Sequence, residues 1–292
     1  MENTTKKPEW LKVRYNASET AEVAGLMSRL GLNTVCSSAN CPNLGTCYRR
    51  RTATFMILGN VCTRNCRFCN IGHAKKGDLL PPDPEEPRKI AEAAHDLGLK
   101  HVVVTCVTRD DLPDGGASVF AEVIRELRRL NPGTTVEVLI SDFKGDRDAL
   151  ETVMAEKPDV LNHNVETVEE LHPTIRPQAD YRRSLEVLSR AKAMGGSFIK
   201  TGIMLGLGET EEQIARTFAD IAAVGCDILV ISQYLQPTPE HAPLMRYVTP
   251  EQFDAYREQA TAAGIRYVIS APLVRSSYLA ADALEAVRNR EA

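Results

Sequence analysis

The sequence predicts an α/β fold: a partial (β/α)6 TIM-type barrel with a cysteine-rich N-terminal extension and a C-terminal extension. Three observations predict it. Six short apolar runs recur along the 292 residues, helical patterns lie between them, and six of the eight cysteines fall between positions 36 and 69. Repeated β-then-α units argue for a parallel sheet. Six units do not complete an eight-unit barrel, but they can form an open part of one.

The six strand candidates are rich in β-branched residues or Leu, as is typical of strands buried on both faces. They cover residues 52–59, 100–107, 135–141, 159–165, 198–205 and 227–235. The run IRYVISAP (265–272) is a candidate for one further strand. We therefore expect an N-terminal extension over 1–51, the partial barrel over 52–264 and a C-terminal extension over 265–292.

Capping residues mark the helices between the strands. The pattern EEPRKIAEAAHDLG ends at Gly98, which suits the C′ position of a helix. Thr210 is an expected N-cap, and Gln213 at N3 completes a capping box. Thr249 is expected to cap a later helix, with Pro250 at its first position.

Composition narrows the class of protein. The formal net charge is -4, with Lys and Arg scattered along the chain, which argues against a nucleic-acid binder. The start MENTTKKPEW lacks an apolar signal region, and no run approaches the roughly 18 apolar residues of a membrane span. We expect a cytoplasmic protein whose thiols stay reduced. Cys106 and Cys226 stand alone and are expected to be small core residues.

The downstream cysteine set, Cys62, Cys66 and Cys69, follows the first strand candidate at spacing C-x3-C-x2-C. Loops after the strands carry the catalytic groups of such barrels. A structural zinc site completed by His73 is one reading, and a redox pair is another. The third is a 4Fe–4S cluster whose fourth iron stays open, beside the apolar Phe68. An open iron could hold and reduce a small chelating ligand.

With an aromatic residue before its last cysteine, this set resembles the signature of the radical S-adenosylmethionine superfamily. GIMLGLGE (202–209) is similar to the Gly-rich motif of that superfamily near the adenine, with Gly202, Gly206 and Glu209 in matching positions. The resemblance implies that S-adenosylmethionine completes the cluster. Its reductive cleavage would give a 5′-deoxyadenosyl radical that abstracts hydrogen from an unactivated C–H bond.

The upstream cysteine set, Cys36, Cys41 and Cys47, lies before the first strand candidate. A zinc site or three core cysteines are the plain alternatives. The two sets together, with CPNLGTC, ATFMILG, TRDDLPDGGA, NHNVET, QYLQPT and RSSY, resemble the lipoyl synthase family over residues 41–278. Ser37, Ser38 and Cys106 depart from the usual family residues, but none of these positions carries an expected ligand.

The resemblance implies insertion of two sulfur atoms, at C6 and C8 of an octanoyl chain on a carrier-protein lysine. Two S-adenosylmethionines would be consumed, and a second 4Fe–4S cluster on the upstream set would be the sulfur donor. The implied partners are an octanoylated carrier protein, either a lipoyl domain of a 2-oxoacid dehydrogenase or a glycine-cleavage H protein, and an electron donor such as ferredoxin or flavodoxin.

The fourth ligand of the donor cluster is implied to be a serine of RSSY. We assign it to Ser277, with Ser276 second, and expect Arg275 to lower the pKa of the hydroxyl. The alternative is that both serines cap a helix that begins near Leu279.

Several polar residues after the strand candidates are further site candidates. Asn164 and Glu166 could bind ribose hydroxyls or cap the next helix. Asp110 and Asp111 could face cofactor or substrate, or cap a turn, whereas His163 is expected to be an interior histidine.

Competing functions differ in where their extra ligands lie. A biotin synthase keeps its second cluster inside the barrel, and a methylthiotransferase has a longer N-terminal domain than the 51 residues here. A non-catalytic iron–sulfur carrier needs four cysteines for each cluster. Iron and sulfide analysis would distinguish a zinc protein from an iron–sulfur protein.

Overall fold

The computed structural model describes residues 6–12, 21–38, 41, 43–49, 54–75 and 77–290. Positions 52 and 53, which begin the first strand candidate, lie outside the described residues. The strands are β1 (Asn33–Thr34), β2 (Thr54–Ile57), β3 (Val61–Cys62), β4 (Gly72–His73), β5 (His101–Cys106), β6 (Thr135–Leu139), β7 (Val160–Asn162), β8 (Phe198–Leu205), β9 (Ile228–Gln233) and β10 (Tyr267–Ser270).

Longer helices follow most strands. The α-helices are α1 (Ala21–Leu30), α2 (Val35–Ser38), α3 (Leu44–Arg49), α4 (Glu86–Asp96), α5 (Ala117–Leu130), α6 (Arg147–Ala155), α7 (His172–Ile175), α8 (Tyr181–Met194), α9 (Glu211–Ala223), α10 (Pro250–Ala262) and α11 (Ala280–Arg288). Short 3-10 turns are η1 (Glu9–Leu11), η3 (Phe143–Gly145) and η4 (Glu169–Leu171).

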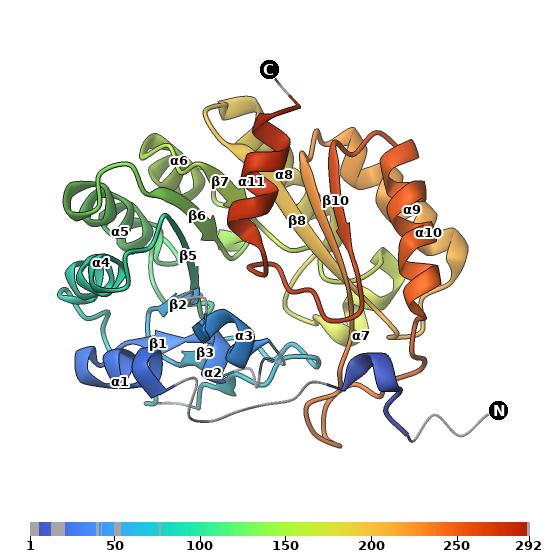
Figure 1. The fold of residues 1–292 in the computed structure, drawn as a ribbon, viewed down its shortest axis with the longest axis horizontal. Helices are drawn as coiled ribbons and strands as arrows, with labels where there is room; N and C mark the ends of the chain where they lie inside the picture. The colour runs from blue at the N-terminus through green and yellow to red at the C-terminus, as the bar shows by residue number, and fades with distance from the viewer. Residues whose placement is uncertain are drawn as a thin grey trace.

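Within the described residues, the main sheet has eight strands in the order β1-β2-β5-β6-β7-β8-β9-β10. From β2 to β10 every neighbouring pair is parallel, and β1 joins β2 antiparallel. All six strand candidates are confirmed, and the candidate at 265–272 forms β10. The sheet curves with α4, α5 and α6 on one flank and α9 and α10 on the other (Figure 1). The fold is thus an open, TIM-type partial barrel.

The helix ends follow the capping residues. The Thr210 side chain accepts from the Gln213 backbone and the Gln213 side chain from the Thr210 backbone, which confirms the capping box at α9. Thr249 is the N-cap of α10, as expected, and its side chain accepts a hydrogen bond from Gln252 N. Gly98, after α4, has φ +61°, the left-handed conformation of a C′ glycine.

Helix α11 covers the end of the barrel opposite α2 and α3 (Figure 1). Its residues Ala283, Leu284 and Val287 form a buried cluster with Val160 and Ile228, the first residues of β7 and β9. Packing here excludes water from the amino ends of the strands. The carboxyl ends of the strands are left to form the site.

Candidate active site

One cavity of about 360 Å³ lies at the carboxyl ends of the strands. Its walls include residues from almost every part of the fold. From the two cysteine sets and the residues named with them, the wall includes Cys36, Cys41, Cys62, Cys66, Cys69, Phe68, Asn164, Glu166, Gly202, Ser276 and Ser277. Cys47 packs against the hydrophobic core instead, and Gly206 and Glu209 are not in the wall. Segments from both ends of the chain therefore meet in one chamber.

Local hydrogen bonds shape the loop that carries the downstream cysteine set. Arg64 N donates to Cys62 Sγ at 3.4 Å, and Cys69 N donates to Cys66 O at 3.0 Å. The His241 Nε2 atom lies 3.0 Å from Cys69 O. The loop is thus held from within and by a segment far downstream in the chain.

Burial raises the pKa of the Cys36, Cys66 and Cys69 thiols, the last to about 12. Binding of a metal group must therefore displace protons from these cysteines. Among the described residues, no three His, Cys, Asp or Glu side chains are placed to share one metal ion. A 4Fe–4S cluster would place each of its cysteine ligands on a separate iron. His73, the possible fourth zinc ligand, directs Nδ1 at Arg64 O, 3.1 Å away.

The Gly-rich turn after β8 is fixed by Glu209. Its carboxylate accepts from Gly206 N at 2.7 Å and from Leu207 N at 2.9 Å. At Gly206, φ is +104°, and a Cβ would lie 2.4 Å from Gln233 Nε2. Glycine is required here by both conformation and space. Glu209 thus shapes the turn from behind the cavity wall.

Asn164 and Glu166 lie just beyond β7 and face the cavity. Asn164 Nδ2 donates to Ser276 Oγ at 2.9 Å, and a Cβ at Gly202 would lie 2.9 Å from Asn164 Oδ1. Burial raises the pKa of Glu166, although the charge of Arg176 opposes this. Both residues can offer oxygen acceptors to the hydroxyl groups of a ribose.

The RSSY segment (275–278) enters the cavity rather than capping α11. Leu279 is the N-cap of α11, and no side-chain bond caps that helix. Thr54 Oγ1 donates to Ser277 Oγ at 2.7 Å. Burial lowers the pKa of Arg275, and the charges of Cys41 and Glu166 oppose this. Capping by the serines, the alternative drawn from sequence, is therefore wrong.

Two expectations for single residues change. Asp110 and Asp111 neither cap the turn near Pro113 nor face the cavity, because they pair with Arg64 and Arg109. Cys106, the last residue of β5, packs against the core, as expected, and also lines the cavity. Cys226 is a buried core residue, as expected.

His163 is interior, as expected, with Nδ1 3.0 Å from Ile140 O. Burial and the charge of Arg176 lower its pKa to about 4, so the ring is neutral at pH 7. Its Nε2 has no partner among the described residues, and the ring lines the cavity. The Nε2 atom is thus available to accept a hydrogen bond from a bound molecule.

Sequence analysis missed several residues that build the site. Thr54, Arg64, Asp142 and Arg176 are buried polar residues that contact the cavity segments. Thr54 is a polar residue inside the first strand candidate, and Arg64 lies in the loop after it. Neither residue carries any further sequence signal. Their partners lie 46 or more positions away.

Comparison with known proteins agrees with this arrangement. The Radical SAM superfamily model matches residues 56–221. A lipoyl synthase of Caldanaerobacter subterraneus is 54% identical over 286 residues, which cover 98% of this chain and 99% of the relative. One of Nitratidesulfovibrio vulgaris is 55% identical over 281 residues, covering 96% and 93%.

Solved structures share the fold at low identity. Methylornithine synthase has a TM-score of 0.53 at 16% identity, covering 87% of this chain and 84% of that chain. The FeFe-hydrogenase maturase HydG of Carboxydothermus hydrogenoformans has a TM-score of 0.57 at 13% identity, covering 94% and 80%. These likenesses concern the fold alone. The near full-length relatives decide the family: the chain belongs to the lipoyl synthase family, within the radical SAM superfamily.

Proposed function

We propose that this protein inserts two sulfur atoms, at C6 and C8, into an octanoyl chain amide-linked to a lysine of a carrier protein. The observation that carries the proposal is the shared cavity. Cysteines of both sets and Ser277 line one chamber, so a radical-generating group and a sulfur donor can face one substrate. Placing the reacting groups together is itself a large part of catalysis.

The downstream set would hold a 4Fe–4S cluster with S-adenosylmethionine on its open iron. When bound, this pair supplies the radical that removes hydrogen from an alkyl carbon. Phe68 provides an apolar wall beside the set, and Asn164 and Glu166 provide acceptors for the ribose. The turn at Gly206, held by Glu209, is proposed to lie near the adenine.

The upstream set would hold the sulfur-donating cluster, with Ser277 as its fourth ligand. An oxygen ligand can leave on protonation, whereas a fourth thiolate would hold its iron more firmly. Arg275 is half-buried next to Ser276. Burial lowers its pKa, and the nearby charge of Cys41 opposes this. Its positive charge favours the ionised, ligating form of a neighbouring hydroxyl.

The cavity also suits the substrate. Its wall includes the apolar side chains Val35, Met56, Ile203, Val230 and Leu235. These side chains offer an alkyl chain apolar contacts, in a wall that also carries polar and charged groups. None of the helices in the described part of the chain is long and apolar enough to cross a membrane. We propose a cytoplasmic enzyme that meets an octanoylated lipoyl domain or H protein and a ferredoxin or flavodoxin.

An anaerobic single-turnover assay tests the proposal. Protein carrying clusters reconstituted with heavy sulfide is mixed with an octanoyl-lysine peptide, S-adenosylmethionine and a reductant. We expect 5′-deoxyadenosine together with a peptide that has gained two heavy sulfur atoms. The same peptide without its octanoyl group is the control. Cofactor cleavage with no sulfur gain on the octanoyl peptide would contradict the proposal, as would a gain of unlabelled sulfur only.

A further inference from the structure

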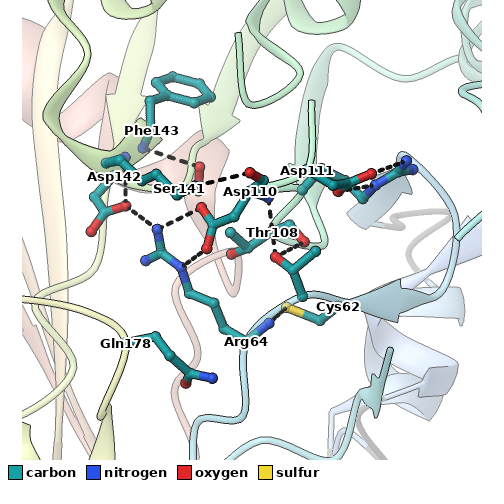
Figure 2. A network of polar contacts seen from close by, with 12 residues as sticks. Cys62, Arg64, Thr108, Asp110, Asp111, Ser141, Asp142, Phe143 and Gln178 are labelled. Carbon is teal, nitrogen blue, oxygen red and sulfur yellow. Dashed lines mark hydrogen bonds and ion pairs between the residues drawn. The ribbon is translucent and has the colours of Figure 1, made fainter. Parts of the chain in front are cut away.

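A buried ion network lies beside Cys62, at the start of the loop that carries the downstream cysteine set (Figure 2). The Arg64 guanidinium binds Asp110 through two bonds, Nε to Oδ2 at 2.7 Å and Nη2 to Oδ1 at 2.9 Å. Its Nη2 also donates to Asp142 Oδ1 at 2.6 Å. The side chains of Arg64 and Asp142 are 3% and 0% exposed. Such paired, planar contacts are the strong form of an ion pair.

The network joins three successive loops at the carboxyl end of the barrel. Arg64 comes from the cysteine loop after β3, Asp110 follows β5, and Asp142 follows β6. Arg183 completes it, because its Nε donates to the second oxygen of Asp142 at 2.8 Å. Two guanidinium groups thus compensate two carboxylates. Without Arg64, Asp110 would lose its guanidinium partner, whereas Asp142 would keep Arg183.

The loop after β6 is strained at the point where it meets Arg64. Phe143 and Lys144 have φ values of +44° and +54°, which residues with a side chain rarely adopt. Asp142 Oδ1 accepts from Lys144 N at 3.0 Å, and Lys144 Nζ donates to Asp110 O at 2.9 Å. Strain of this kind persists only where surrounding contacts enforce it, and it gathers at functional sites.

We propose that Arg64 is a positioning residue for the cluster that Cys62, Cys66 and Cys69 would hold. Its guanidinium clamps the cysteine loop to the loops after β5 and β6, and it keeps two nearby carboxylates compensated. This inference rests on the proposed function only in assuming a cluster on these three cysteines. It does not depend on the substrate or on the sulfur donor.

Two effects of Arg64 can be separated. Loss of the guanidinium leaves uncompensated negative charge near the cluster, which lowers the reduction potential of the cluster because the added electron is repelled. Loss of the forked contacts also loosens the loop, which slows cofactor cleavage. Changes to groups that support metal ligands cost about 10- to 100-fold in activity or metal affinity.

The experiment compares Arg64→Gln and Arg64→Lys with wild type and with Arg67→Gln. Arg67 lies on the same loop with an exposed side chain, so its variant controls for loss of one charge there. Each anaerobically loaded protein is measured for iron content, for cluster potential by redox titration, and for 5′-deoxyadenosine formation with its kcat and KM. We expect Arg64→Gln to show a lower potential and about a 10-fold or larger loss of kcat.

Two further variants separate the effect of the Arg64 charge from the effect of its forked contacts. Arg64→Lys keeps the charge but not the fork, so its potential should stay near wild type while kcat falls. In the double variant Arg64→Gln with Asp110→Asn, the potential should return towards wild type because one charge of each sign is gone. If Arg64→Gln does not fold, Arg64→Lys still tests the proposal. A wild-type kcat in Arg64→Lys would contradict the role of the forked contacts in holding the cysteine loop. Wild-type potential and kcat in Arg64→Gln overturn the whole proposal.

Failure of the proposed function is distinguishable. Wild-type protein that cleaves S-adenosylmethionine but adds no sulfur would contradict the proposed function and leave the Arg64 readouts valid. Wild-type protein that assembles no iron–sulfur cluster on the downstream set would overturn both.

Discussion

Thr54 Oγ1 donates a hydrogen bond to Ser277 Oγ at 2.7 Å, although the two residues are 223 positions apart. Thr54 begins β2, and its side chain also hydrogen-bonds the Cys36 thiol. One buried hydroxyl therefore contacts a cysteine of the upstream set and the serine proposed to complete it. Groups that hold metal ligands in place commonly govern how those ligands behave.

Thr54→Val is expected to impair sulfur transfer selectively. Valine keeps the shape of the side chain but cannot bond Ser277, so we expect about a 10-fold slower formation of lipoyl product. Cleavage of S-adenosylmethionine should stay close to wild type. Thr54→Ser, which keeps the hydroxyl, is the matched control and should retain most of the activity. Both products are measured by mass spectrometry, and an equal rate in Thr54→Val and wild type would show that this contact is dispensable.

Ser277→Ala tests the proposed oxygen ligand. The variant should keep both clusters and cleave S-adenosylmethionine, yet form almost no lipoyl product, because the donor cluster lacks its releasable ligand. Ser277→Cys should give a stable cluster that transfers sulfur poorly. Ser276→Ala loses the contact with Asn164 and is the neighbouring control. Loss of product in Ser276→Ala with full activity in Ser277→Ala would move the ligand by one residue. Full activity in both variants would exclude serine ligation.

Replacing each cysteine set with alanine should separate the two clusters. Wild-type protein is expected to hold about eight irons and eight sulfides, and each triple variant about half of these. Without Cys62, Cys66 and Cys69, no 5′-deoxyadenosine should form. Without the upstream set, some cofactor cleavage should remain but no sulfur transfer.

The single-cysteine control is Cys226→Ala, which removes a thiol buried away from the cavity. It should leave the iron content unchanged. Stoichiometric zinc with little iron in the wild-type protein would contradict the two-cluster assignment. Lipoyl product from the variant without the upstream set would show that this set is not the donor.

Breaking the buried pair Lys200–Glu137 by removing one partner is expected to destabilise the fold strongly. Lys200 Nζ lies 2.9 Å from Glu137 Oε1, and both side chains are fully buried. Burial alone would raise the pKa of Glu137, but the charges of Lys200 and His101 lower it to about 2. Lys200→Met removes the lysine partner of this buried carboxylate, which should lower the free energy of unfolding by about 3–5 kcal/mol.

Urea unfolding at pH 7 measures the Lys200→Met effect, and the double variant Lys200→Met with Glu137→Leu is the control. The double variant should recover most of the lost stability, because no unpaired charge remains. In the wild type, ionised Glu137 stabilises the fold above its unfolded pKa of about 4.3, and this contribution is lost as pH falls towards 2. A Lys200→Met protein as stable as wild type would show that the pair adds nothing.

The sequence by itself determined the elements and the chemistry of the cysteine sets. Strand runs, the capping box at Thr210 and the N-cap at Thr249 depend on neighbours within a few positions, so a local pattern carries them. Cys62, Cys66 and Cys69 are also close in sequence. Their spacing therefore pointed to a shared ligand before any fold was known.

Only the tertiary structure decided which distant side chains meet. The bonds from Arg64 to Asp110 and Asp142 span 46 and 78 positions, and Asn164 reaches Ser276 over 112. The same carboxylate of Asp110 could have faced the cavity or capped a turn. Which of these contacts the Asp110 carboxylate makes depends on the register of the parallel strands, because that register determines which loops lie side by side. Because these contacts form only when the sheet closes around its core, no short stretch of sequence encodes them.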